Sequence, residues 1–361
     1  MEPVNIDDYE RLAEELLEPG AFGYFAGGAG DEWTLRENRD AFARWVLRPR
    51  ALVDVSAVST VTTVLGTEVS MPVLVAPVAF QRMAHPDGEL ATARATAAAG
   101  TIMCLSTMAT AATADVAAAA PGAPLWYQVY VFKDRGVTRA LIDQAVDAGF
   151  SALVLTADTP YLGRRERDLR TGFRIPPEIA VPACEAAAGV GIGGTPQELL
   201  AFCANDLSWR DLEALAADSP LPVLAKGILT AEDARLAAAH GAAGVIVSNH
   251  GGRQLDGVTA TLDALPEVAE AVDLDVLMDG GVRRGTDAVK ALALGARAVL
   301  VGRAALWGLA ARGEEGVAHV LELLRAEVEL ALALLGRASP AEIDRATIAA
   351  CPPSPSSAPG S

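Results

Sequence analysis

The segment 248–256, SNHGGRQLD, combines one of only four histidines in this 361-residue chain with an arginine three positions later. It directly follows the apolar run AGVIV, so His250 and Arg253 stand at the end of an expected strand. Histidine accepts protons near neutral pH, and arginine binds carboxylates through paired hydrogen bonds. The segment is therefore either a reactive site that binds an anion or a polar turn that closes a buried strand.

The segment 155–168, LTADTPYLGRRERD, offers partners for both residues. Arg165 and Arg253 together could form a two-arginine clamp for a carboxylate. Asp158 is a candidate to orient the imidazole of His250 and to stabilise its charged form. The other three histidines are expected to be structural: His85, His240 and His319.

Two glycine–arginine segments, DGGVRRG at 279–285 and VGR at 301–303, favour a phosphate site. Glycine pairs also serve tight turns, but here two such segments follow neighbouring apolar runs. Lys226 ends the run PVLAKG and has two interpretations: a Schiff-base lysine, or a lysine that holds negative charge on a cofactor ring. A nicotinamide cofactor is disfavoured, because GGAG at 27–30 follows helical sequence and no GxGxxG follows an early strand.

Short apolar runs that recur along the chain must position these residues. Their continuous hydrophobicity is typical of strands buried on both faces, as in a parallel sheet. Helical patterns separate most of them, so the sequence predicts a (β/α)8 TIM barrel. The expected strands are 71–77, 101–106, 125–131, 152–157, 222–227, 243–248, 275–280 and 298–303.

Side chains at the C-terminal ends of barrel strands converge on one mouth, where active sites of this fold lie. Most of the residues expected there are polar or charged, which a purely structural barrel would not need. They are Ala79, Ser106, Gln128, Tyr130, Thr156, Asp158, Lys226, Ser248, His250, Arg253, Asp279, Arg283, Gly302 and Arg303.

Other segments extend the barrel within a single domain at 1–350. Residues 1–70 are expected to form a helical cap, and the amphipathic stretch 314–336 a closing helix. The connection after the fourth strand is about 70 residues long, and we expect its part at 160–220 to be an inserted mobile lid rather than a decorative loop. The Pro/Ser-rich tail at 351–361 is expected to be disordered.

Composition excludes several classes of function. The chain is 51% hydrophobic, and its 46 Asp and Glu against 29 Lys and Arg give a net charge of −17, which disfavours nucleic acid and anionic membranes as partners. Four scattered cysteines without CxxC spacing suggest neither a metal site nor a disulfide framework. With no apolar leader or spanning stretch, a cytoplasmic location is expected.

Five motifs resemble the FMN-dependent 2-hydroxy acid oxidase and dehydrogenase family, which includes glycolate oxidase, lactate oxidase, hydroxymandelate oxidase and mandelate dehydrogenase. They are SNHGGRQLD, LTADTPYLGRRERD, LAKGILTAEDARLA, DGGVRRGTDAVKALALGARAVLVGR and YFAGGAGDEWTLREN. The resemblance extends from about residue 5 to residue 350 and implies an FMN-binding barrel and a homotetramer.

The resemblance also implies a role for each residue. His250 would be the catalytic base with Asp158 as its partner, and Lys226 would stabilise the reduced flavin, which removes the Schiff-base interpretation. The implied substrate contacts are Tyr24, Met108, Tyr130, Arg165 and Arg253, with Tyr130 also catalytic. The implied FMN contacts are Pro77, Val78, Ala79, Ser106, Gln128, Thr156, Lys226, Ser248, Asp279, Gly280, Gly281, Arg283, Gly302 and Arg303.

The implied reaction is oxidation of an (S)-2-hydroxy acid to the 2-oxo acid, with oxygen reoxidising FMN and hydrogen peroxide as the by-product. One alternative is a dehydrogenase that passes electrons to a quinone or cytochrome, and another is a repurposed, non-catalytic flavin protein. Met108 stands where plant glycolate oxidases have a tryptophan, so lactate-like, medium-chain and mandelate-type acids all remain candidate substrates.

Overall fold

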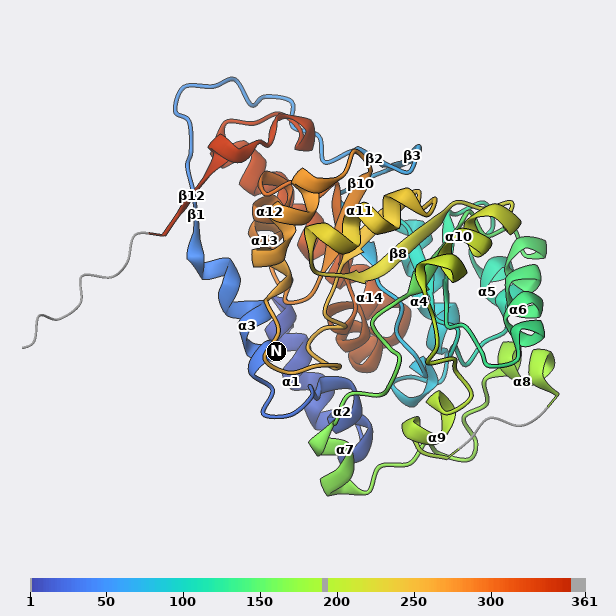
Figure 1. Cartoon of the computed structure of the whole chain (residues 1–361). Coiled ribbons are helices and arrows are strands. Elements are labelled where there is room, and N and C mark those ends of the chain that lie inside the picture. The colour runs from blue at the N-terminus through green and yellow to red at the C-terminus, as the bar shows by residue number, and fades with distance from the viewer. Residues whose placement is uncertain (1, 190–193, 352–361) are drawn as a thin grey trace, which may run out of the picture.

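The computed structural model describes residues 2–189 and 194–351. Its centre is a closed barrel of eight parallel strands, each joined to the next in sequence order, with β11 pairing with β4 to close the ring. The predicted (β/α)8 barrel is therefore confirmed (Figure 1). The barrel strands are β4 (Val73–Val75), β5 (Met103–Leu105), β6 (Leu125–Val129), β7 (Ala152–Thr156), β8 (Val223–Ile228), β9 (Gly244–Val247), β10 (Asp275–Asp279) and β11 (Ala298–Val301).

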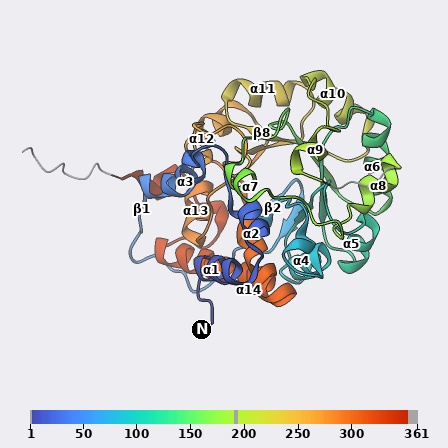
Figure 2. The same ribbon diagram turned by 90° about the horizontal axis from the view of Figure 1, so that it is seen from below.

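An outer ring of helices covers the barrel strands, which explains why the strands are apolar on both faces (Figure 2). The last helix bends at Arg312 and Gly313, so the helix expected at 314–336 is its second part. The ring is formed by α4 (Gly88–Ala98), α5 (Thr113–Ala119), α6 (Arg135–Asp147), α10 (Trp209–Asp218), α11 (Ala231–Ala239), α12 (Thr261–Ala271), α13 (Gly285–Ala293) and α14 (Arg303–Leu335).

The base of the barrel is closed by a hairpin of β2 (Thr62–Val64) and β3 (Thr67–Val69). Val64 and Val69 are buried and belong to the same apolar cluster as interior residues such as Ile102 and Leu224. In Figure 1 this hairpin lies at the end of the barrel opposite to α2, α7 and α9. The hairpin therefore acts as a plug at the N-terminal ends of the strands.

The N-terminal cap contains α1 (Ile6–Leu16), α2 (Pro19–Ala26) and α3 (Trp33–Asp40). Helix α1 packs on α14, where the hydroxyl of Tyr9 lies 2.7 Å from Nδ1 of His319. Strand β1 (Trp45–Leu47) pairs with β12 (Ile348–Ala350), so the segment that follows the cap helices meets the C-terminal end of the described chain in a small antiparallel sheet.

The long connection between β7 and β8 contains α7 (Glu166–Thr171), α8 (Pro182–Ala188) and α9 (Pro196–Leu200) before α10. Helix α10 contacts β8 and α11, and so takes the place of a barrel helix. Helices α7 and α9 instead lie inside the ring of helices when the barrel is viewed end-on (Figure 2). Most of the expected tail at 351–361, namely 352–361, and part of the expected lid, 190–193, lie outside the described residues.

Candidate active site

A large cavity opens at the C-terminal ends of the barrel strands, where the sequence predicted the site. It encloses ≈ 1250 Å³ of empty space, which includes the part open to solvent. Most of the predicted residues line it: Tyr24, Pro77, Val78, Ala79, Ser106, Met108, Gln128, Tyr130, Thr156, Arg165, Lys226, His250, Arg253, Asp279, Gly280, Gly281, Arg283, Gly302 and Arg303.

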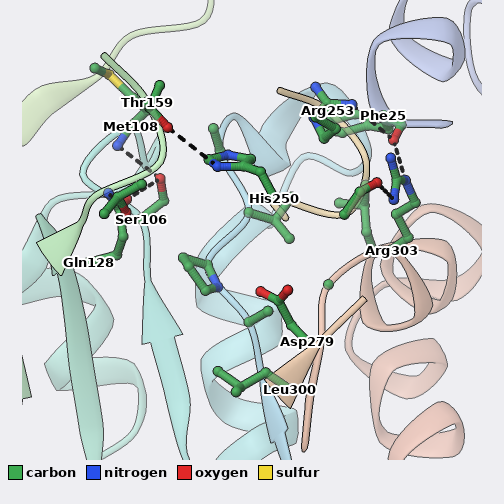
Figure 3. Close-up of a pocket in the computed structure, with 18 of the residues that line it drawn as sticks. Phe25, Ser106, Met108, Gln128, Thr159, His250, Arg253, Asp279, Leu300 and Arg303 are labelled. Atoms are coloured by element: carbon green, nitrogen blue, oxygen red, sulfur yellow. Dashed lines mark hydrogen bonds between the residues drawn. The ribbon is translucent and has the colours of Figure 1, made fainter. Parts of the chain in front are cut away.

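His250 lies at the centre of this cavity, between Met108 and Thr159 on one side and Arg253 on the other (Figure 3). Its Nδ1 is 2.9 Å from Oδ1 of Asp158 and 3.4 Å from the hydroxyl of Thr159. Asp158 does not line the cavity, but its contact with Nδ1 can fix the orientation of the imidazole. Because Nδ1 faces this carboxylate, the remaining ring nitrogen, Nε2, is left to exchange a proton with a ligand.

Electrostatics favour a neutral His250 beside an ionised Asp158. Burial lowers the pKa of His250 below its ordinary value, and the nearby charges of Lys226 and Arg165 act in the same direction, although Asp158 opposes them. Burial would raise the pKa of Asp158, but the hydrogen bond with His250 and the charge of Lys226 act in the opposite direction and hold the pKa low. A neutral imidazole is the form that can accept a proton.

Arg253 and Arg165 both lie near the ring of Tyr24, at 4.9 Å and 6.0 Å from the centroid. Nη1 of Arg253 donates to the backbone oxygens of Tyr24 at 2.6 Å and Gly27 at 2.8 Å. Burial and the charge of Arg165 lower the pKa of Arg253 to about 10. Neither arginine forms an ion pair with a carboxylate of the described residues, so this pair is suited to bind an anion.

Asp168 on α7 was not predicted as part of the site. Its carboxyl group is buried, and its Oδ2 has no hydrogen-bond partner among the described residues. Burial raises its pKa, although the positive charges of Arg253 and Arg165 oppose that effect. Asp168 is therefore the acidic neighbour that moderates the positive charge of the two arginines.

Lys226 is held as a charged ammonium group rather than as a free amine. Its Nζ lies 3.0 Å from Oδ2 of Asp279 and donates to the hydroxyl of Ser248 at 2.8 Å. Burial opposes the charge, but Asp279 and Asp158 together raise the pKa of Lys226. An ammonium group is a poor nucleophile, so the geometry agrees with rejection of the Schiff-base interpretation.

Ser248 differs from the other expected cofactor residues because it does not line the cavity. Its hydroxyl accepts hydrogen bonds from Nζ of Lys226 and from the backbone nitrogen of His250, at 2.8 Å and 3.0 Å. The side chain is fully buried between these two partners. Ser248 therefore holds neighbouring site residues in place.

Polar side chains at the ends of β5, β6 and β7 form a chain of hydrogen bonds along one wall. Gln128 donates from Nε2 to the hydroxyl of Thr156 at 2.9 Å and accepts at Oε1 from Ser106 at 3.3 Å. This network fixes the amide of Gln128 beside the cavity, on the side opposite to Arg303 (Figure 3).

The ends of β10 and β11 form the other wall. Helix α14 begins at Arg303 without a side-chain cap, so its free N–H groups provide positive potential there. Gly281 has a φ of +81°, and a Cβ there would lie 1.9 Å from the backbone oxygen of Asn38. This glycine is thus needed for packing against the cap as well as for the bend of the turn.

An apolar wall at the mouth was missed by the sequence analysis. It is formed by side chains from the inserted segment and from the ends of β4 and β7, with Met108 beside them. The additional lining residues are Phe80, Leu162, Pro196, Leu199 and Leu200. Thr195 and Glu198 form a capping box at the start of α9, and this local signal was readable in the sequence as a helix start.

Comparison with known proteins identifies the family. The model of the FMN-dependent dehydrogenase family matches residues 13–350. The chain belongs to this family. It is an FMN-dependent 2-hydroxy acid oxidoreductase, and FMN is its cofactor.

Individual relatives agree with this assignment. The chain is 52% identical to glycolate oxidase 1 of Zea mays over 354 residues, with 95% of each chain covered. It is 50% identical to L-lactate oxidase of Nostoc sp., covering 95% of this chain and 97% of that protein. A solved structure of a mandelate oxidase variant with (S)-mandelic acid matches with a TM-score of 0.86 at 41% identity, over 94% and 96% of the two chains.

The polar atoms of the cavity fit FMN. Oδ1 of Asp279 and Nε of Arg283 are buried without a hydrogen-bond partner among the described residues, which is costly unless a ligand supplies one. Lys226 supplies a positive charge, and the N-terminus of α14 with Arg303 supplies an anion site. The expected FMN contacts thus provide donors, acceptors and charge in one cavity.

Proposed function

We propose that the protein oxidises an (S)-2-hydroxy acid to the 2-oxo acid. Bound FMN would serve as the hydride acceptor, and oxygen would reoxidise it and be reduced to hydrogen peroxide. The observation that carries the proposal is His250, whose Nδ1 lies 2.9 Å from Oδ1 of Asp158, in one cavity with Arg165 and Arg253, neither of which forms an ion pair with a carboxylate of the described residues. This arrangement can bind a carboxylate and remove a proton from the adjacent hydroxyl group.

Each residue has a defined task in this proposal. Arg165 and Arg253 bind the substrate carboxylate, and Nε2 of His250 accepts the hydroxyl proton. Asp158 stabilises the imidazolium that results, as the carboxylate does beside other catalytic histidines. Burial raises the pKa of Tyr130, so its phenol stays protonated and can donate a hydrogen bond to the substrate oxygen.

The cofactor is proposed to lie deeper in the cavity. Pro77, Val78 and Ala79 would contact it through the backbone, and the polar wall of Ser106, Gln128 and Thr156 would bind its ring. Lys226 would hold negative charge on the reduced ring, and Asp279 would accept a hydrogen bond from the ribityl chain. The phosphate would be bound by Gly280, Gly281, Arg283, Gly302 and Arg303.

The substrate side chain is proposed to be larger than that of glycolate. Met108, Leu199 and Leu200 face the mouth with apolar and flexible side chains. Each apolar group that a ligand buries against this wall strengthens binding of that ligand. Lactate-like, medium-chain and mandelate-type acids all fit this chemistry, and the relative with (S)-mandelic acid bound supports the aromatic class.

Oxygen is proposed as the acceptor in preference to a quinone or cytochrome. The oxidases from maize and Nostoc are about half identical to this chain, whereas a solved (S)-mandelate dehydrogenase is 38% identical at a TM-score of 0.91. Across residues 2–189 and 194–351, none of the helices has the length and apolar character that crossing a bilayer requires. The family resemblance further suggests a homotetramer, which light scattering would test.

The decisive experiment adds glycolate, lactate, 2-hydroxyoctanoate and (S)-mandelate separately to the yellow protein without oxygen. The proposal expects loss of the flavin absorbance with at least one acid, fastest with an apolar one. When one equivalent of acid per flavin is used, it expects one hydrogen peroxide per flavin after air is admitted. Bleaching without peroxide would favour the dehydrogenase. Stable absorbance with every acid would favour a repurposed flavin protein.

A further inference from the structure

The turn that carries His250 and Arg253 lies against helix α3 of the N-terminal cap, more than 200 positions away in sequence. Asn249 and Asn38 exchange two hydrogen bonds there, each of 2.8 Å between an amide nitrogen and an amide oxygen. Both side chains are buried, with 4% and 2% of their surface exposed. A buried reciprocal amide pair is costly to break, because both partners lose their hydrogen bonds without access to water.

A second contact joins the far end of the same segment to the first turn of α3. The carboxylate of Asp256 accepts hydrogen bonds from the backbone nitrogens of Thr34 at 2.8 Å and Trp33 at 3.3 Å. The residue before the helix, Glu32, provides no side-chain cap. Asp256 therefore caps α3 from a different part of the chain, where a negative charge also interacts favourably with the helix dipole.

Glycine makes the close approach between these two contacts possible. A Cβ on Gly252 would lie 2.7 Å from Cα of Leu35, so the turn can touch α3 only where it has no side chain. The backbone nitrogen of Gly252 also donates to Oδ1 of Asn249 at 3.0 Å. Segment 249–257 is thus bound to the helix at its start, its middle and its end.

His250 sits inside this bound segment in a strained conformation. Its φ is +58°, in the left-handed region that residues other than glycine seldom adopt. Such a conformation is strained and persists only where surrounding contacts enforce it. The hydroxyl of Ser248 bonds its backbone nitrogen on one side, and the Asn249 contact with α3 follows directly on the other.

We propose that α3 acts as a template that holds the turn in this conformation, with Asn38 and Asp256 as positioning residues for His250 and Arg253. The inference rests on the proposed function, since it concerns the same proton transfer. Neither residue lines the cavity, and both bridge the turn and α3 by hydrogen bonds, although Asn38 also packs against Gly280 and Gly281. A purely structural role, in which the contacts only fix the cap to the barrel, predicts lower thermal stability with unchanged catalysis.

The test compares Asn38→Ala with Asp40→Ala, an exposed position at the end of the same helix. The readouts are the rate of anaerobic flavin reduction, its KM and its pH profile, together with amide hydrogen exchange of the peptide that contains 248–257. A misplacement of about 1 Å can cost about 100-fold in rate. We expect Asn38→Ala to lower the maximal rate by about 10–100-fold on that ground, while Asp40→Ala matches the unmodified protein.

The pH profile separates positioning from stability. Burial is the largest cause of the low pKa of His250, so a loosened turn should raise that pKa and move the acid limb of the rate to higher pH. Amide exchange of the turn should become faster in Asn38→Ala. Asn249→Ala combined with Asn38→Ala should be no worse than the more damaging single variant, because the two amides act as one unit.

Asp256→Asn provides a second variant if Asn38→Ala does not fold, and it should change the same readouts more weakly. Lower thermal stability with unchanged rate, KM, pH profile and exchange would overturn the proposal. Failure of the unmodified protein to be reduced by any acid would instead contradict the proposed function. The exchange of the turn would then still test its dependence on α3.

Discussion

The two ends of the barrel differ in what they bury. At the base, Val64 and Val69 of the β2–β3 hairpin pack with Ile102 in an apolar cluster. At the mouth, Lys226 and Asp158 are buried charges, and Oδ1 of Asp279 has no hydrogen-bond partner among the described residues. The two ends share the same eight strands, so the residues at the strand ends and the segments that cover them decide which chemistry is present.

The base of the barrel therefore serves mainly stability, and the mouth serves mainly function. Buried charges and unpartnered polar atoms cost free energy unless a ligand satisfies them, whereas apolar packing stabilises the fold without a ligand. FMN and substrate therefore supply contacts that the mouth lacks by itself. Substitutions at the mouth should change catalysis more than stability, and substitutions at the base should do the reverse.

His250→Gln should produce the largest effect at the mouth. Glutamine can keep a hydrogen bond to Asp158 but cannot accept a proton, so the rate of flavin reduction should fall by about 10²–10⁴-fold. The protein should stay yellow and keep its melting temperature within a few degrees. Stopped-flow absorbance under anaerobic conditions measures this, with His240→Gln, at the residue directly after α11, as the matched control. Rapid reduction of the His250→Gln protein would refute the proposed base.

Ile102→Ala tests the other end of the barrel. Ile102 is fully buried within the base cluster, and loss of a large aliphatic side chain from such a site costs about 2–5 kcal/mol. Denaturant unfolding should show this loss, while the rate of flavin reduction below the unfolding transition should change by less than about twofold. A large loss of rate in the fully folded variant would show that the two ends are coupled.

Leu199→Ala probes the apolar wall, which belongs to the mouth but carries no charge. Leu199 is 3% exposed and lines the cavity from α9. Loss of its side chain should weaken binding of a medium-chain acid by about 1–3 kcal/mol relative to lactate. The ratio of kcat/KM for the two acids measures this, and Phe202→Ala, at an exposed position just after α9, is the control. An unchanged ratio would place the substrate side chain elsewhere.

The strands and most of the mouth were predictable because they rest on local signals. Continuous apolar runs identified the barrel strands, and the polar residues directly after those runs had to converge once the barrel closed. Ser248 shows the limit of that rule, since its position at a strand end did not reveal that Lys226 would bind its hydroxyl inside the protein.

What the sequence analysis missed depends on contacts between distant segments. The β2–β3 plug and the β1–β12 pair have strands of only 3 residues, too short for a clear periodic pattern. Leu199 reaches the cavity only because the inserted segment folds back over the mouth. Asn38 is an ordinary helix residue until Asn249 is placed beside it, so its role needed the three-dimensional structure.

The smallest expected effect is the change in the rate of flavin reduction with pH near neutrality. Burial lowers the pKa of His250 below its ordinary value of 6.5, so the proton is already lost at pH 7 and the base is ready. The rate of flavin reduction should therefore change by less than about threefold between pH 7 and 8, and should fall about tenfold per unit only below the lowered pKa. The free energy of unfolding should change with pH in the same direction, because the unfolded chain binds the His250 proton more readily than the folded chain does. Stability should therefore be highest above the ordinary pKa of histidine and should decline as the pH falls from that value toward the lowered pKa of the folded protein. Ile102→Ala should leave the acid limb unchanged, because Ile102 is apolar and packs in the cluster at the other end of the barrel from His250. An acid limb above pH 7 would mean that the charge of Asp158, rather than burial, determines the pKa of His250.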